Sequence, residues 1–183
     1  RDALVHTKYG DVLPSNKALA GAGIELIGME RREFLLKDAL EQVKPDYDFI
    51  FIDCPPSLEL LTLNALCAAD AILVPVQGEY FALEGLSDLM NTVRIVRRSL
   101  NPHLELEGVL LTMFDGRTNL ALQVAEEVKH YFPGKVYATV IPRNVRLSEA
   151  PSHGKPITSY DRTSRGAEAY TAFAAEFLDK QSA

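Results

Sequence analysis

A run of apolar residues that ends on a carboxylate and two prolines constrains this chain more than any other feature. It occupies residues 49–56 and reads Phe-Ile-Phe-Ile-Asp-Cys-Pro-Pro. An unbroken apolar run of this length predicts a strand that is buried on both faces, as in a parallel sheet flanked by helices. Asp53 would then stand at the carboxyl end of the strand, where open α/β sheets bind ligands and where a carboxylate can hold the water shell of Mg²⁺. This is the Walker B arrangement of nucleotide-binding sites.

The glycine-rich phosphate loop that usually accompanies this arrangement, Gly-x-x-x-x-Gly-Lys-Ser/Thr, does not occur in the sequence. The two Gly-Lys pairs, Gly134-Lys135 and Gly154-Lys155, are followed by Val and Pro rather than by Ser or Thr. Because the chain begins on Arg1 and not on Met, we expect that an N-terminal segment carrying the loop is missing.

Composition places the chain among ordinary globular proteins. Its 183 residues are 47% hydrophobic and 24% charged, which suits one soluble domain. No apolar run approaches the roughly 20 residues that cross a bilayer, and no signal peptide is recognisable, so we expect a cytoplasmic protein. Cys54 and Cys67 form no Cys-x-x-Cys motif and are expected to be buried, reduced thiols, and the four histidines lack metal-ligand spacing.

Strand-like and helical runs alternate along the chain, which predicts an α/β fold with a mostly parallel sheet and helices on both faces. We expect strands at 49–53, 71–76, 107–114 and 136–141, and helices at 33–44, 58–69, from about 85 to 100, 119–131 and 164–179. Residues 1–20 are left as an N-terminal remnant without a role. Residues 21–183 are expected to form one α/β nucleotide-binding domain.

Charge is distributed unevenly. The net charge is −6, but residues 135–166 contain six Lys and Arg against two acidic residues and so carry +4. A local basic face on an acidic protein can bind the phosphates of DNA, and such binding weakens as salt rises. A solvated surface without a ligand is the alternative interpretation of the same charges.

Several segments resemble the ParA/Soj family, the deviant-Walker ATPases that segregate plasmids and chromosomes. Residues 51–57 resemble the Walker B strand and switch of that family, and residues 74–77 with 81–86 resemble its next strand and loop. The most specific matches are Leu-Thr-Met-Phe-Asp-Gly-Arg-Thr at 111–118 and Ile-Pro-Arg-Asn-Val-Arg-Leu-Ser-Glu-Ala-Pro-Ser at 141–152. Residues 164–170 resemble the start of the family's last helix, so the resemblance covers about 24–178.

The resemblance implies a P-loop NTPase-like fold that here lacks the phosphate-loop strand. It also implies a homodimer that depends on Mg²⁺ and ATP, binds DNA without sequence preference and is stimulated by a DNA-binding partner of the ParB type. Such a protein is expected at the nucleoid and not at a membrane. Because the phosphate loop and its lysines are absent from the sequence, we expect that the intact parent hydrolyses ATP but that this chain alone neither hydrolyses ATP nor dimerises on it.

The same resemblance implies roles for individual residues. Asp53 would hold Mg²⁺ through water and is the one catalytic residue present, while Pro55 and Pro56 would stiffen the switch that senses the γ-phosphate. The residues implied for the adenine pocket, at two neighbouring strand ends, are Met113, Pro142, Arg143 and Asn144. Those implied for DNA contact are Arg146, Arg162 and Arg165. Structural roles remain open for several of these: Asp53 as a helix cap, Met113 as core, Pro142 as a strand end and Arg143 as a surface charge.

Three other functions are weighed against the partitioning ATPase. A membrane-cycling ATPase of the MinD type would end in a basic amphipathic helix, whereas this tail carries Glu168, Glu176 and Asp179 against Lys180. An iron–sulfur ATPase of the nitrogenase type would present cysteines for a shared cluster, which this pattern does not favour. A non-enzymatic module that binds DNA or a partner through the same fold remains the main alternative.

Overall fold

A computed structural model describes residues 2–55, 57 and 59–182 of the chain. They divide into two compact units. The first unit comprises residues 1–72 and 89–105, and the second comprises 73–88 and 106–183. The predicted single domain at 21–183 stays a prediction. None of the described helices is long and apolar enough to cross a bilayer.

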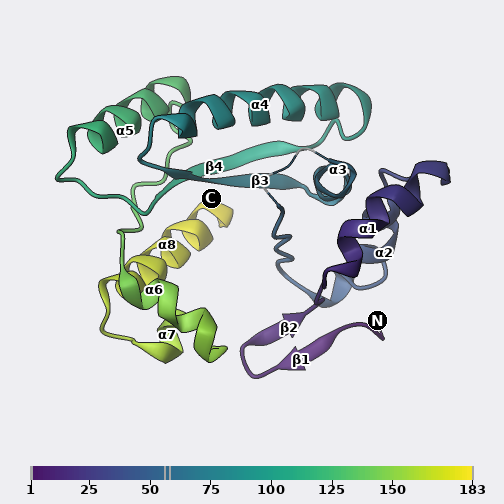
Figure 1. Cartoon of the computed structure of the whole chain (residues 1–183), viewed down its shortest axis with the longest axis horizontal. Helices are drawn as coiled ribbons and strands as arrows, with labels where there is room; N and C mark the ends of the chain where they lie inside the picture. The colour runs from purple at the N-terminus through teal and green to yellow at the C-terminus, as the bar shows by residue number, and fades with distance from the viewer. Residues whose placement is uncertain (1, 56, 58, 183) are drawn as a thin grey trace. The chain divides into compact units, whose positions relative to one another are not determined.

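The secondary structure follows the alternation expected from the sequence for most of its length (Figure 1). In chain order the elements are β1 Val5–Thr7, β2 Gly10–Val12, α1 Ala18–Glu25, η1 Leu26–Gly28, α2 Leu35–Leu40, η2 Lys44–Asp46, α3 Leu60–Ala68, β3 Ala71–Gln77, α4 Phe81–Ser99, β4 Glu105–Thr112, α5 Asn119–Tyr131, α6 Val145–Glu149, η3 Ala150–His153, α7 Ile157–Tyr160 and α8 Arg165–Gln181.

The core of the first unit lies where α3 meets the second half of α4. Leu66, Val93, Val96 and Leu104 are buried against one another there. Asn101, just beyond α4, is also buried, and its side-chain amide donates to the backbone carbonyls of residues 66 (2.9 Å) and 69 (2.8 Å) at the end of α3. This amide satisfies helix-terminal carbonyls that lack partners within α3. Asn101 therefore ties the segment after α4 to the end of α3.

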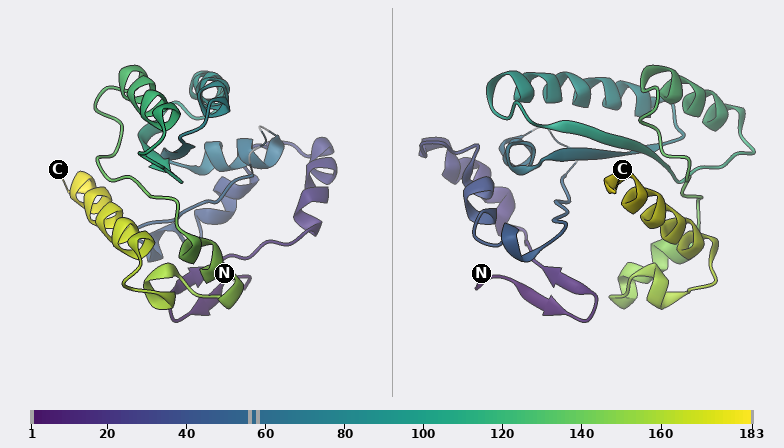
Figure 2. Two further views of the ribbon diagram at one scale, coloured as in Figure 1. Left: turned by 60° about the vertical axis from the view of Figure 1, so that its left-hand side comes forward. Right: turned by 180° about the vertical axis from the view of Figure 1, so that it is seen from behind.

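The second unit is built on parallel strands. β3 and β4 form a two-stranded sheet, and residues 136 and 142 extend it through parallel bridges to 109 and 114 of β4. Leu110, Tyr137 and Ile141 are buried in its core, where Phe173 and Phe177 of α8 pack against them. α5 covers the opposite face of the sheet from α8 in all the views of Figures 1 and 2. The α/β fold with helices on both faces is confirmed here.

Gly108 of β4 allows the segment at 135–137 to approach the strand closely. A Cβ atom at this position would lie 2.6 Å from the ring of Tyr137 and 2.8 Å from the carbonyl oxygen of Lys135. Both distances are shorter than van der Waals contact, so a side chain would force the segment away from the strand. Close packing of the aromatic ring on the backbone therefore requires glycine at 108.

The predicted strand at 49–53 is wrong for the described residues. None of the strand pairings of the described chain includes this segment, and Phe49, Ile50 and Phe51 are 42%, 38% and 72% exposed. Burial on both faces was the basis of the prediction, but burial depends on the strands and helices around a segment and not on its own composition. Asp53 consequently does not end a buried strand in this structure. Cys54, expected to be buried, is exposed, whereas Cys67 is buried as expected.

The predicted strand at 136–141 is only partly present. Its two ends bridge to β4, but between them the backbone N–H groups of Ala138 and Thr139 donate to the carboxylate of Glu176 on α8, at 2.7 and 2.8 Å. These N–H groups are satisfied by a side chain instead of a further strand, so the segment runs beside β4 without forming a continuous ladder.

Candidate nucleotide and nucleic-acid sites

The end of β4 and the segment at 141–144 meet in the second unit. Phe114 donates its backbone N–H to the carbonyl of Ile141 (3.1 Å), and Arg143 donates its own to the carbonyl of Phe114 (3.3 Å). These bonds flank the parallel bridge between Phe114 and Pro142. The structure thus brings Met113 and the Pro142–Asn144 turn, all four residues implied for the adenine pocket, to one edge of the sheet. This is the edge at which parallel α/β sheets bind ligands.

Met113 has an unusual backbone at this edge. Its φ of 47° lies in the left-handed region, and its side chain is 45% exposed. A non-glycine residue in this region costs about 1–2 kcal/mol, and such strain concentrates at ligand sites. A core role for Met113 does not fit an exposed side chain on a strained backbone, so a surface role beside the bridge is the better interpretation.

Asn144 acts as a helix cap. Its side-chain oxygen accepts from the backbone N–H of Arg146 at 2.9 Å and so begins α6. Arg143 is exposed beside it, and its charge contributes to lowering the pKa of Asp115. Through this cap, Asn144 fixes the turn that carries Pro142 and Arg143.

A bidentate ion pair that was not expected from the sequence lies just past the same strand end. Arg117 donates to both carboxylate oxygens of Asp115, at 2.8 and 2.7 Å. The hydrogen bonds from Arg117, with smaller contributions from its charge and that of Arg143, lower the pKa of Asp115 to about 2. The sequence signal is the Asp-Gly-Arg segment after β4, whose composition is typical of a turn but does not specify the pairing.

The residues implied for DNA contact lie on and after α6. Arg146 forms ion pairs with Glu149 (2.8 Å) and Asp161 (3.4 Å), and hydrogen bonding to Arg146 lowers the pKa of Glu149. Arg162 and Arg165 are exposed, and neither forms an ion pair with the residues that the structure describes. Two of the three arginines are therefore available to an anion without first losing a partner.

The first turn of α8 packs closely on α6. A Cβ atom at Gly166 would lie 2.6 Å from the side chain of Leu147, so this contact requires glycine. Ser164 caps α8 by accepting from the N–H of Ala167 at 3.2 Å. These contacts fix Arg165 at the start of α8 close to the helix that carries Arg146.

Asp53 belongs to the first unit. It is exposed, and it forms no ion pair with other described residues. Pro55 follows it in an exposed segment without helix or strand, and Pro56 lies outside the described residues. Although Cys54 is exposed as a residue, partial desolvation of its sulfur and, in addition, the charge of Asp53 raise the pKa of its thiol.

The donor set at Asp53 is compatible with Mg²⁺ bound through water. The described residues contain no cluster of three or more Asp, Glu, His or Cys side chains that could enclose a metal ion. Mg²⁺ keeps several of its waters and is commonly held by one or two carboxylates together with substrate phosphates. A single exposed carboxylate therefore fits this ion but not a site built from protein ligands alone.

Comparison with known proteins identifies the relatives of this chain. Residues 2–106 match a family model described as an AAA domain. The chain is 66% identical to the sporulation initiation inhibitor protein Soj of Bacillus subtilis over 166 residues, which cover 91% of this chain and 66% of Soj. It is 54% identical to the chromosome partitioning protein ParA of Myxococcus xanthus over 173 residues, 94% of this chain and 61% of that protein. The chain thus spans somewhat less than two thirds of these relatives.

A solved structure shares the fold. The crystal structure named cobyrinic acid a,c-diamide synthase from Mycobacterium smegmatis, with bound ADP and magnesium, superposes with a TM-score of 0.83 at 38% identity, over 100% of this chain and 68% of that one. Structural neighbours of this kind are P-loop NTPases, which confirms the predicted fold class. The motifs at 111–118 and 141–152, the α/β architecture and these identities agree, and the chain belongs to the ParA/Soj family of partitioning ATPases.

Proposed function

We propose that this chain is the part of a partitioning ATPase that contacts the adenine of ATP and the phosphates of DNA. One observation carries the proposal: the Phe114–Pro142 bridge brings Met113 and Arg143 to one sheet edge in a chain 66% identical to Soj. The parent protein would act at the nucleoid in the cytoplasm, in chromosome or plasmid segregation, with a DNA-binding partner of the ParB type.

Each set of residues has a distinct part in this function. Met113 and Pro142 offer apolar surface to a base, and Arg143 adds a positive charge at its edge. Asp53, with Pro55 and Pro56 after it, would hold the water shell of Mg²⁺ near the phosphates. When bound, Mg²⁺ neutralises charge on the phosphate oxygens.

The polypeptide of these 183 residues is proposed to be inactive in ATP hydrolysis and unable to dimerise on ATP. Its sequence contains no Gly-x-x-x-x-Gly-Lys-Ser/Thr loop, whose backbone amides and lysine stabilise the charge that develops during phosphoryl transfer. Appreciable Mg²⁺-dependent phosphate release by the purified chain, abolished by Asp53→Ala, would contradict this part of the proposal.

The DNA-binding part is tested by fluorescence anisotropy with a labelled duplex at several salt concentrations. Arg165→Gln and Arg162→Gln should each weaken binding and reduce the slope of log affinity against log salt by about 1, because each removes one phosphate contact. Lys17→Gln removes the same charge from an exposed position of the first unit and should leave the affinity almost unchanged.

The outcome also distinguishes the main alternative. Tight DNA binding by the chain without nucleotide, insensitive to Mg²⁺-ATP, would favour a non-enzymatic DNA-binding module. Equal losses in Lys17→Gln and Arg165→Gln would show that net charge rather than this surface governs the affinity, and would refute the assignment of Arg162 and Arg165.

A further inference from the structure

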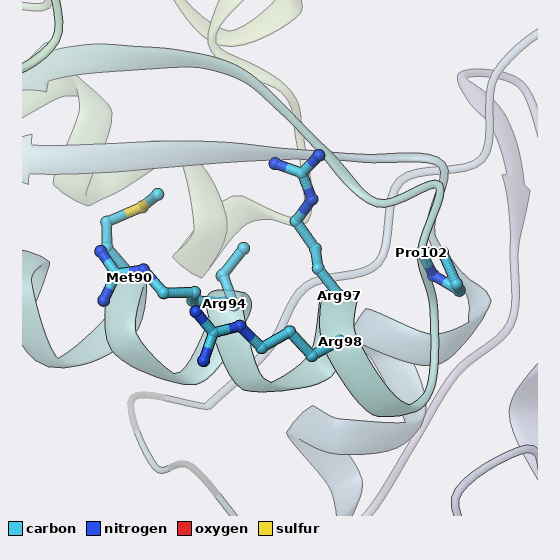
Figure 3. A pocket seen from close by; sticks show the side chains of 6 residues that line it. Met90, Arg94, Arg97, Arg98 and Pro102 are labelled. Carbon is cyan, nitrogen blue, oxygen red and sulfur yellow. The ribbon is translucent and has the colours of Figure 1, made fainter.

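A basic hollow lies beside the C-terminal half of α4, within the first unit, and contains none of the residues assigned to the nucleotide and DNA sites. Its volume is about 470 Å³. Figure 3 shows two of its guanidinium groups, those of Arg94 and Arg98, extending in the same direction along the helix. The residues that line it are Met90, Val93, Arg94, Arg97, Arg98 and Pro102.

The helix itself creates this grouping. Position 94 lies four residues after 90, three before 97 and four before 98, so Arg94 is a neighbour of the other three side chains on the surface of α4. Val93, which is 3% exposed, turns toward the core and provides an apolar floor together with Met90 and Pro102. The hollow therefore combines an apolar base with three positive charges.

The three arginines have no acidic partner within the part of the chain that the structure describes. Arg94 donates to the neutral side chain of Asn91 at 2.8 Å, and none of the ion pairs between described residues includes Arg97 or Arg98. The helix offers no acidic side chain one turn earlier, because the residues four before these arginines are Met90, Val93 and Arg94 itself. Like charges at this spacing destabilise a helix slightly.

The helix dipole accounts for only part of this arrangement. Cations in the last turn of a helix are stabilised by the partial negative charge of its carboxyl end, and Arg97 and Arg98 occupy that turn. Arg94 lies a turn earlier, where the dipole has little effect, and it adds repulsion to both. In a chain of net charge −6, three arginines around one recess indicate an anionic ligand.

The apolar floor narrows the chemistry of that ligand. Guanidinium groups bind carboxylates and phosphates through paired hydrogen bonds. The rise between Arg94 and Arg98 is about 6 Å, from four residues of helix, and alternate side chains of an extended peptide repeat at about 6.6 Å. A peptide can also place an aliphatic side chain over Met90 and Pro102, whereas a phosphate backbone has no apolar group to bury there.

We propose that this hollow binds an acidic, partly apolar peptide segment of a partner protein, with carboxylates on Arg94, Arg97 and Arg98 and an aliphatic side chain on the floor. The hollow shares no residue with the edge at Met113 or with Asp53. It adds a protein-binding surface to a chain whose family role concerns nucleotide and DNA.

The test measures anisotropy of a short fluorescein-labelled peptide in which Glu alternates with Leu, using the full chain. Arg98→Gln and Arg97→Gln should each weaken binding about fivefold or more, since each removes a charge-assisted contact. Met90→Gln should weaken it about threefold, because a polar group replaces part of the apolar floor. Lys17→Gln, an equal loss of charge elsewhere in the first unit, should leave it unchanged.

Three results would overturn the proposal. The first is equal peptide affinity for Arg98→Gln and Lys17→Gln, which would show that the hollow is not the binding site. The second is equal binding of a matched peptide with Gln in place of Glu, which would remove the role of the carboxylates. The third is displacement of the peptide by a DNA duplex with a loss of duplex binding in Arg98→Gln, which would make the hollow a nucleic-acid surface.

Discussion

Glu176 should be the carboxylate whose loss most destabilises the second unit. Its two oxygens accept from the backbone N–H groups of Ala138 (2.7 Å) and Thr139 (2.8 Å), where the segment beside β4 has no ladder partner. A hydrogen bond to a charged group contributes about 1.5–3 kcal/mol. Because Ala138 is exposed and water can replace part of the loss, we expect Glu176→Ala to lower the free energy of unfolding by about 2–3 kcal/mol and Glu176→Gln by about 1–2 kcal/mol.

The pH dependence gives this prediction a specific signature. Burial alone would raise the pKa of Glu176, but hydrogen bonds from Thr139 and Ala138 and the charge of Lys180 lower it below its ordinary value of 4.5. A lowered folded-state pKa means that the stabilisation is complete above about pH 4.5 and is lost as the pH falls through that lower pKa. The difference between the wild-type chain and Glu176→Gln should therefore be constant near neutral pH and shrink in acid.

Urea denaturation followed by circular dichroism at pH 7, 5 and 3.5 measures both effects. Asp179→Asn on the same helix is the matched control, because Asp179 is exposed and its carboxylate bonds to none of the described residues; its effect should stay within about 0.5 kcal/mol. If Glu176→Gln is as stable as the wild-type chain at pH 7, or if their difference is the same at pH 7 and 3.5, the assignment of the carboxylate to the two N–H groups is wrong.

Four further predictions rest on single residues. Asn101→Ala should lower the free energy of unfolding by about 2–3 kcal/mol, measured by urea denaturation, because two buried carbonyls at the end of α3 lose their donor. Met113→Val should cost about 1–2 kcal/mol whereas Met113→Gly should change stability by less than about 1 kcal/mol, since glycine adopts a φ of 47° without strain and a β-branched residue adopts it least readily. Asp115 should titrate at about 2 by carboxyl NMR and move toward its ordinary value of 3.8 in Arg117→Gln, with no movement refuting the pairing. The wild-type chain should self-associate through its exposed apolar segment at 49–51, which analytical ultracentrifugation would detect as species heavier than the monomer. Phe51→Lys should reduce that association.

The helix at 119–131 was predictable to the residue because all of its determinants are local. Thr118 caps it by accepting from the N–H of Ala121, and its apolar positions repeat at helical spacing. The strand at 71–76 was equally clear because an apolar β-branched run lies between two turns. Local chemistry that agrees with the tertiary structure is what sequence patterns detect.

The segment at 49–53 shows where such patterns fail. Its composition is that of a buried strand, yet Phe51 is 72% exposed. Hydrophobicity determines the free energy that a segment gains when it is buried. Burial itself requires neighbouring strands and helices that cover the segment. The strand at 136–141 is only partial because Glu176, about 38 residues away, accepts hydrogen bonds from its backbone. The sequence around 136–141 gives no sign of this distant acceptor.

For the candidate site, the meeting of two strand ends was predictable and the conformation of its residues was not. Parallel strands bring their carboxyl ends to one edge, so Met113 and Pro142 were expected to be neighbours. The left-handed backbone of Met113 could not be expected, because methionine has no preference for that region. The ion pair between Arg146 and Asp161 joins residues fifteen apart and follows only from the packing of the helices between them.

That ion pair changes what the basic segment can do. Residues 135–166 contain six cationic and two acidic side chains. A count along the sequence would spread the neutralisation by the two acids over all six cations. In the structure both acids, Glu149 and Asp161, contact the same arginine, Arg146. Neutralisation is therefore concentrated on one side chain. A phosphate must compete with two carboxylates for Arg146 but with none of the described ones for Arg165, so the charge that attracts DNA should come chiefly from the start of α8.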